Sequence, residues 1–186
     1  DAGKKNIFYK NLKEYFGLNK KILEIGSGTC QLSNYLAIGT NNEIVAFDLT
    51  RKSLELGSNF AKKNKIKNIK FVEGDIFDQE IFYNLFDFVL TIGVLHHTKD
   101  PYKAFLKSIE TLKPGGYIVL GLYNSYGRKR LEIRRFFFKL FGKKIIYFFD
   151  PLVRFLSKNK NINKDKIDAW INDQYYHPVE KNFSID

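Results

Sequence analysis

A glutamate and two glycines that could bind a charged ligand stand together in the run Leu23-Glu24-Ile25-Gly26-Ser27-Gly28-Thr29. Residues 22–25 have the apolar character of a short buried strand, and residues 31–37 have the pattern of a helix. Gly26 and Gly28 permit a tight turn and leave no side chain between the backbone and a ligand. The N–H groups that open the helix face the same place, and Glu24 could offset a positive charge there. The run therefore predicts a site for a charged, nucleotide-like ligand.

This turn is not a dinucleotide-binding fingerprint. The pattern G-x-G-x-x-G requires glycine at position 31, where this chain has Gln31. That difference disfavours a nicotinamide-dependent dehydrogenase of the short-chain type. A G-x-G turn by itself is a weak signal, because it also fits an ordinary strand-to-helix connection.

Three more apolar runs end in polar residues, and their order along the chain strengthens the prediction. Residues 43–48 end in Asp48, residues 68–73 lead into Gly74-Asp75-Ile76, and residues 86–92 lead into Gly93-Val94-Leu95-His96-His97. Open α/β sheets bind ligands at the carboxyl ends of their strands, where a carboxylate can accept both hydroxyls of a ribose. Each acid alone also fits a helix N-cap or a solvated loop. The ordered set favours a ligand site along one sheet edge.

Together these motifs resemble the class I S-adenosylmethionine-dependent methyltransferases, specifically the small-molecule group with a type-11 methyltransferase domain. The resemblance covers about residues 20–124 and includes Leu112-Lys113-Pro114-Gly115-Gly116. It implies an α/β fold with a Rossmann-like, doubly wound, mostly parallel sheet. It also implies S-adenosyl-L-methionine as cofactor and S-adenosyl-L-homocysteine as product.

The resemblance assigns cofactor-binding roles residue by residue. Glu24, Gly26 and Gly28 would surround the methionine part, Asp48 the ribose and Asp75 the adenine amino group, and Ile76 would pack on the adenine face. The complete expected set is Glu24, Gly26, Ser27, Gly28, Asp48, Leu49, Asp75, Ile76 and Gly93. Cys30 departs from the family, which usually has a third glycine there. Because position 30 sets how closely helix and strand approach, a small cysteine should affect cofactor affinity only slightly.

Histidines are the candidate catalytic groups. Methyl transfer from a sulfonium requires mainly alignment and exclusion of water, and a base only where the acceptor must lose a proton. His96 and His97 follow the fourth strand, although each also fits a loop histidine that packs or bonds to backbone. His177 lies in a run that resembles the pattern Asp-Gln-Tyr-x-His-Pro-x-Glu of a subset of these enzymes. There Tyr175, His177 and Glu180 either face the substrate or hold a structural turn. Three histidines, two of them adjacent, predict no metal site.

The fourth strand also bears on the acceptor. Thr91-Ile92-Gly93-Val94 stands where enzymes that methylate amino groups of nucleic acids and proteins have Asn/Asp-Pro-Pro-Tyr. This favours transfer to an oxygen or carbon atom of a small or lipid-like molecule.

Composition sets the class of protein. The chain has 186 residues, 44% hydrophobic and 27% charged, which is typical of a soluble globular protein. Its single cysteine excludes a disulfide framework and predicts a reducing, cytoplasmic compartment. We expect a cofactor-binding core over residues 1–126 and a helical cap over residues 127–186 of the same structural domain. Nothing after position 124 has the pattern of the family's C-terminal strand pair, so we expect that pair to be missing.

The expected cap is basic and aromatic. Residues 128–160 contain eleven Lys/Arg against two acids, and so carry +9 of the net charge of +11. Apolar positions 131, 138, 141, 145, 149, 152 and 156 predict two or three amphipathic helices, broken near Gly142 and Asp150-Pro151.

Three interpretations of the cap stay open. Its aromatic face packs on the domain, or the helices contact an anionic membrane, or they bind nucleic acid. Nucleic acid is disfavoured because the charge is not spread over the domain and no recognised motif is present. A non-catalytic module that binds a membrane or a partner through the cap is the alternative function. The intact cofactor motifs argue against it. The sequence does not predict the oligomeric state.

Overall fold

The computed structural model describes residues 6–78, 82–141, 144–158, 163–175, 181 and 183. It divides the chain into two compact units, Asp1–Leu122 and Tyr123–Asp186, called here the sheet unit and the helical unit. The division falls four residues before the boundary predicted from composition. That the two parts form one structural domain stays a prediction.

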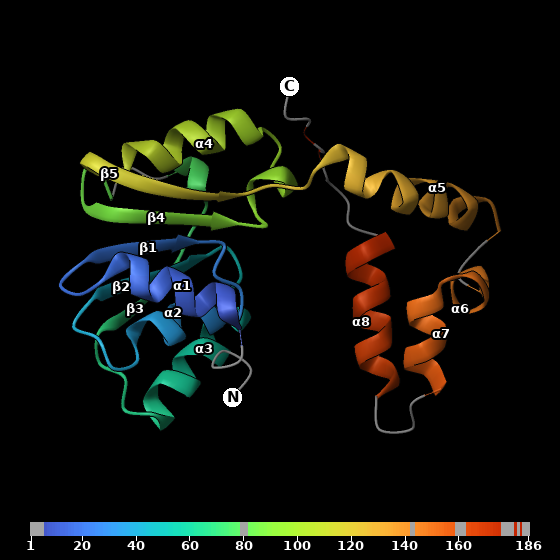
Figure 1. Cartoon of the computed structure of the whole chain (residues 1–186), viewed down its shortest axis with the longest axis horizontal. Coiled ribbons are helices and arrows are strands. Elements are labelled where there is room, and N and C mark those ends of the chain that lie inside the picture. The colour runs from blue at the N-terminus through green and yellow to red at the C-terminus, as the bar shows by residue number, and fades with distance from the viewer. Residues whose placement is uncertain are drawn as a thin grey trace. The chain divides into compact units, whose positions relative to one another are not determined.

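The sheet unit is built on five parallel strands in the order β3-β2-β1-β4-β5 (Figure 1). This confirms the predicted doubly wound, Rossmann-like sheet, because the chain starts in the centre, winds outward to β3 and then returns to β4. Among the described residues β5 pairs with β4 alone and forms an edge of the sheet. The strands are β1 (Lys21–Ile25), β2 (Glu43–Asp48), β3 (Ile69–Glu73), β4 (Phe86–Ile92) and β5 (Leu112–Gly121).

Helices cover both faces of this sheet. Alternate residues of a strand point to opposite faces, so Ile22 packs with α1 and α2, whereas Leu23 packs on the side of α4. Helix α3 packs beside β2 through Leu54 and Ala46. The elements are α1 (Ile7–Phe16), α2 (Gln31–Ala37), α3 (Arg51–Lys63) and α4 (Pro101–Glu110), with short 3-10 turns η2 (Ile76–Asp78) and η3 (Leu95–His97).

The helical unit contains α5 (Ser125–Phe141), α6 (Lys144–Phe149), α7 (Pro151–Lys158) and α8 (Lys164–Tyr175) (Figure 1). Helix α5 ends at Phe141 and α6 at Phe149, next to the breaks predicted near Gly142 and Asp150-Pro151. A small apolar core joins α6, α7 and α8, and Leu131 of α5 packs against it. Its buried members are Ile146, Val153, Ile167, Ile171 and Tyr175.

The buried carboxylate of Asp150 forms hydrogen bonds to residues of three helices around this core. Its carboxylate is 2% exposed and accepts hydrogen bonds from the Tyr175 hydroxyl at 2.5 Å and the Arg134 guanidinium at 3.1 Å. It also accepts the backbone N–H of Leu152 at 2.8 Å, at the start of α7. One buried carboxylate thus links α5, α7 and α8. The burial of Tyr175 and its bond to Asp150 raise the pKa of its hydroxyl to about 12.

The prediction of which apolar residues form the inner face of the cap is partly wrong. Leu131 and Leu156 pack against the core, but Phe149 and Leu152 are exposed. Positions 138, 141 and 145 carry side chains outside the described set. The reason is that the predicted period runs across the ends of α5 and α6, and a helical period continued from one helix into the next no longer tells which side faces inward.

Two further observations concern the end of the chain and the length of its helices. In the described part beyond α8, Phe183 forms an isolated parallel bridge with Asn124, and its N–H donates to the Tyr123 carbonyl at 3.0 Å. The described residues beyond β5 contain no strand pair. No helix in the described segments combines the length and the apolar character needed to cross a bilayer.

Candidate active site

The turn after β1 is as tight as its glycines predicted. Gly26 has φ +68° and Gly28 φ +52°, and the Ser27 N–H between them donates to the Phe47 carbonyl at 3.0 Å. A Cβ at Gly26 would lie 2.3 Å from Cγ2 of Val94, the residue that follows Gly93 after β4. The backbone of this turn therefore needs glycine for its conformation and for the close approach of the next loop.

Asp48 connects this turn to the neighbouring loops. One carboxylate oxygen accepts the Gly28 N–H at 2.7 Å and the other accepts the Thr50 N–H at 2.8 Å. The Asp48 carbonyl also accepts the Gly74 N–H at 3.1 Å, at the end of β3. Each carboxylate oxygen keeps acceptor capacity for a further donor. Asp48 is thus held in a fixed orientation and keeps acceptor capacity for ligand hydroxyls.

Glu24 is a buried carboxyl group beside that turn. It is 8% exposed, and the Ser33 hydroxyl on α2 donates a hydrogen bond to it. Burial raises the pKa of Glu24 to about 7; the Ser33 hydrogen bonds oppose the rise, and the negative charge of Asp48 adds to it. A positively charged ligand would stabilise the ionised form of Glu24 and so offset the effects of burial and of the Asp48 charge. Sequence reasoning missed Ser33, because a serine inside a helix gives no signal until the helix is packed against the strand.

Cys30 occupies a strained position at the start of α2. It is fully buried with φ +58° and packs with Ala46 of β2 and Leu54 of α3. A Cβ at Gly57 of α3 would lie only 2.5 Å from the Cys30 Cβ. Position 30 therefore controls the approach of α3 as well as that of the strand. Burial raises the pKa of the Cys30 thiol to about 11, so it is a packing group rather than a reactive thiolate.

The remaining cofactor candidates lie at the same sheet edge. The Asp75 carboxylate accepts the Phe77 N–H at 2.9 Å. Ile76 is buried in the apolar cluster below the β1 and β2 ends, whereas Leu49 is 68% exposed. Gly93 has φ +76° and donates its N–H to Gly121 of β5 at 3.0 Å. The structure brings the segments that carry Glu24, Asp48 and Asp75 to one edge, as the sequence predicted.

The histidines divide according to burial. His96 is fully buried in η3, and its ring centroid lies 4.1 Å from that of the half-buried His97. By exposure His97 is the better placed to meet a substrate. His177 and Glu180 lie outside the described residues. Tyr175 is buried in the helical unit and bonded to Asp150, which supports its structural interpretation.

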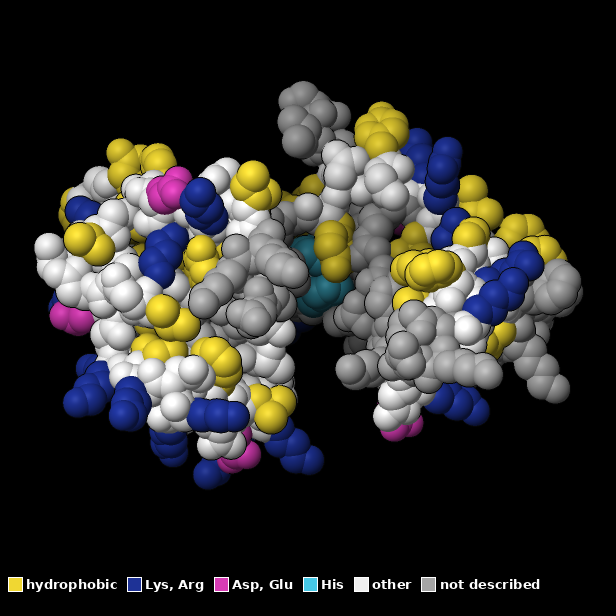
Figure 2. Space-filling view, turned by 60° about the horizontal axis from the view of Figure 1, so that its bottom comes forward, with side chains coloured by type: hydrophobic (Ala, Val, Ile, Leu, Met, Phe, Trp, Pro, Cys, Tyr) yellow, Lys and Arg dark blue, Asp and Glu magenta, His cyan; other side chains and the backbone are white. Residues whose placement is uncertain are grey.

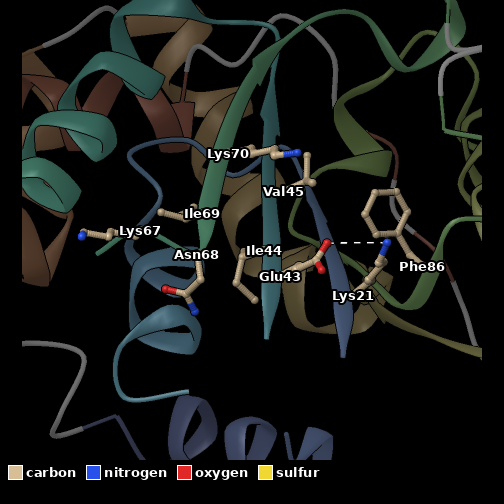
Figure 3. A pocket seen from close by; sticks show the side chains of 9 residues that line it. All are labelled: Lys21, Glu43, Ile44, Val45, Lys67, Asn68, Ile69, Lys70 and Phe86. Atoms are coloured by element: carbon tan, nitrogen blue, oxygen red, sulfur yellow. Dashed lines mark ion pairs between the residues drawn. The ribbon is translucent and has the colours of Figure 1, made fainter. Parts of the chain in front are cut away.

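A separate hollow of about 330 Å³ opens at the amino ends of the strands (Figure 3). The first residues of β1 and β2, Lys21 and Glu43, form an ion pair of 3.6 Å across it. Phe86, Asn68 and Lys67 are also in its lining. This hollow is at the edge of the sheet opposite Glu24 and Asp48, and it is not part of the candidate site.

Comparison with known proteins identifies the family. A family described as a methyltransferase domain matches residues 18–181, which include most of the helical unit. The chain belongs to this family. Its fold is that of the class I S-adenosylmethionine-dependent methyltransferases.

Individual relatives agree with this membership. A demethylmenaquinone methyltransferase of Geobacillus is 30% identical over 103 residues, which cover 54% of this chain and 44% of the relative. A ubiquinone biosynthesis O-methyltransferase of Rickettsia canadensis is 27% identical over 120 residues, covering 63% and 49%.

A solved structure matches more of the chain. A putative S-adenosyl-L-methionine-dependent methyltransferase from Methanococcus maripaludis superposes with a TM-score of 0.56 at 26% identity, covering 89% of this chain and 72% of that one. The chain spans about half or less of the length of the curated relatives that it matches.

The residues at the sheet edge fit S-adenosylmethionine, the cofactor of this class. No heavy atom lies within 4 Å of the place where a Cβ at Gly28 would stand, so a ligand can approach the backbone of the turn there. Asp48 has acceptor capacity for two hydroxyls, and Glu24 is a buried carboxyl group whose ionised form a cation would favour.

Proposed function

We propose that this chain transfers the methyl group of S-adenosylmethionine to an oxygen or carbon atom of a small or lipid-like acceptor. The observation that carries the proposal is the junction of Gly28 with Asp48, beside buried Glu24. It presents two carboxyl groups and a glycine turn to one ligand at the carboxyl edge of a parallel sheet.

Each group has a stated task in this proposal. Bound S-adenosylmethionine supplies a methyl group activated by a positively charged sulfur. Glu24 and the turn at Gly26, Ser27 and Gly28 hold the methionine part, and Asp48 orients the ribose while Leu49 lies beside it. Asp75 and Ile76 hold the adenine, and Gly93 lets the next loop pass closely. The chain thus contributes binding and alignment, which is most of what an in-line displacement needs.

The acceptor is proposed from two observations. Thr91-Ile92-Gly93-Val94 lacks the motif of amino-methylating enzymes. Relatives are named as a demethylmenaquinone methyltransferase, a ubiquinone biosynthesis O-methyltransferase and a ubiquinone/menaquinone biosynthesis C-methyltransferase. These names support a quinone-like ring whose methylated atom is oxygen or carbon. His97 is the proposed base for an acceptor that must lose a proton, and His177 is a second candidate.

The proposal is tested in two steps with the purified chain. Calorimetry should detect binding of S-adenosylmethionine and S-adenosylhomocysteine, and labelled cofactor should transfer its methyl group to a hydroxylated or unmethylated quinol. His97→Ala should lower turnover while leaving cofactor affinity nearly unchanged. Absence of cofactor binding contradicts the proposal. Binding without transfer to any of these acceptors would favour the non-catalytic alternative.

A further inference from the structure

Helix α5 carries large exposed apolar side chains that lie outside the described core of the helical unit. Leu131 faces the core of the helical unit, whereas five large side chains on the other side of α5 are between 49% and 69% exposed. With 100° per residue these five fall within an arc of about 100°. This set, called the α5 stripe, consists of Tyr126, Ile133, Phe136, Phe137 and Leu140. It runs for about 21 Å along the helix.

Cations lie within and beside the α5 stripe. The helix contains six Lys/Arg and a single acid, Glu132. Exposed Lys129 and Arg130 project on the same side as the stripe by helical phase, and the Lys129 ammonium lies 4.4 Å from the Tyr126 ring centroid. Figure 2 shows apolar and basic side chains gathered side by side on the helical unit. The surface is therefore both apolar and positively charged.

Helix α7 has the same character. Val153 is fully buried in the core, while Leu152 and Phe155 are 45% and 68% exposed. Arg154 and Lys158 are exposed beside them. Two helices of this unit thus combine a buried side, an outward apolar side and cations.

We propose that the α5 stripe binds an anionic lipid surface. Aromatic and aliphatic side chains flanked by Lys and Arg match the boundary between acyl chains and negatively charged headgroups. Charge decides against a second copy of the chain on this surface, because each copy would bring the same cations to the contact. A nucleic acid would use the cations but leave the apolar side chains without a role.

Vesicle flotation with the whole chain tests this inference, with pure phosphatidylcholine vesicles compared with vesicles that also contain phosphatidylglycerol. The chain should float with the anionic vesicles only, and added salt should weaken its binding. Phe136→Ser/Phe137→Ser should reduce the partition coefficient at least about tenfold. Lys129→Gln/Arg130→Gln should reduce it about fivefold for each charge removed.

Matched controls lie on the sheet unit. Tyr102→Ser/Leu106→Ser on α4 and Lys62→Gln/Lys63→Gln on α3 remove exposed residues of the same kinds and should leave the partition coefficient within about twofold. Circular dichroism and cofactor affinity confirm that each variant is folded.

Several results would overturn the inference: no flotation, equal flotation with neutral vesicles, or equal loss in the controls. Sedimentation that reveals a dimer dissociated by the phenylalanine variant would assign the stripe to a second copy instead. Binding of the α5 stripe to an acidic protein, with no binding to vesicles, would assign the stripe to a protein partner. None of these results touches cofactor binding, so failure here is distinct from failure of the proposed methyl transfer.

Discussion

The backbone N–H of Gly28 donates a 2.7 Å hydrogen bond to the Asp48 carboxylate, and this bond fastens the turn after β1 to the end of β2. The Thr50 N–H donates to the other oxygen of the same carboxylate. Two loops that are distant in sequence are thus joined by one side chain. Asp48 therefore has a structural role in addition to the proposed ribose contact.

Asp48→Ala should weaken both binding and folding. Loss of a charged acceptor should lower S-adenosylmethionine affinity at least about tenfold in calorimetry. The two N–H groups also lose their acceptor, so the free energy of unfolding should fall by about 1–3 kcal/mol in urea titration. Glu55→Ala is the control, since Glu55 is exposed and forms an ion pair with Arg51 on the same helix. Unchanged cofactor affinity would remove Asp48 from the ribose site.

Glu24 should make folding and cofactor binding depend on pH in opposite directions. Its folded pKa of about 7 is above the ordinary 4.5, so the folded protein binds the proton more tightly. The stabilisation is present below about pH 4.5 and is lost as the pH rises through 7, by at most about 3 kcal/mol. Glu24→Gln should lack this loss in urea titrations across that range. If the difference in unfolding free energy between the parent and Glu24→Gln does not change with pH, Glu24 does not have the raised pKa.

The same carboxyl group should attract a cationic cofactor only when ionised. S-adenosylmethionine affinity should therefore rise between about pH 6 and about pH 8, and Glu24→Gln should abolish the rise. Ser33→Ala removes a hydrogen bond that lowers the Glu24 pKa, so it should move the rise to higher pH. If the affinity of the Gln variant changes with pH as the parent's does, another group is responsible.

Gly26 and Gly28 should differ in their tolerance of a methyl group. Both have positive φ, which costs alanine about 1 kcal/mol, but only at Gly26 would the new Cβ meet Val94, at 2.3 Å. Gly26→Ala should therefore lower the free energy of unfolding by about 2–4 kcal/mol and Gly28→Ala by about 1 kcal/mol. Val94→Ala should recover part of the loss at position 26. Equal losses of unfolding free energy in the two alanine variants would show that Val94 moves away from position 26 at little energetic cost.

Cys30 and Gly57 should behave as a coupled pair. Gly57→Ala would place its Cβ 2.5 Å from that of Cys30, so alone it should destabilise the protein by about 1–3 kcal/mol. Cys30→Gly removes the obstacle and suits φ +58°, so the double variant should regain most of that loss. The double-mutant cycle compares the thermal unfolding of the parent protein, the two single variants and the double variant. If the two changes in stability simply add in the double variant, Cys30 and Gly57 are not in the contact described here.

The sequence by itself determined the features that a few adjacent residues encode. The first four strands and the glycine turn at Gly26 follow from local pattern and backbone conformation. The start of α4 is also encoded by adjacent residues, because the Asp100 side chain accepts the Lys103 N–H at 3.0 Å and Pro101 opens the helix. The order of polar strand ends then placed Glu24, Asp48 and Asp75 at one edge, because parallel strands all point the same way.

Tertiary structure decided what depends on contacts between distant segments. It buried His96 and left His97 half-exposed, paired Cys30 with Gly57, and gave Ser33 its bond to Glu24. It also left the large apolar side chains on one side of α5 out of the described core of the helical unit, and placed Leu131 against that core instead. The physical reason is that a side chain's type sets what it gains from burial, whereas the surface that buries it is supplied by residues elsewhere in the chain.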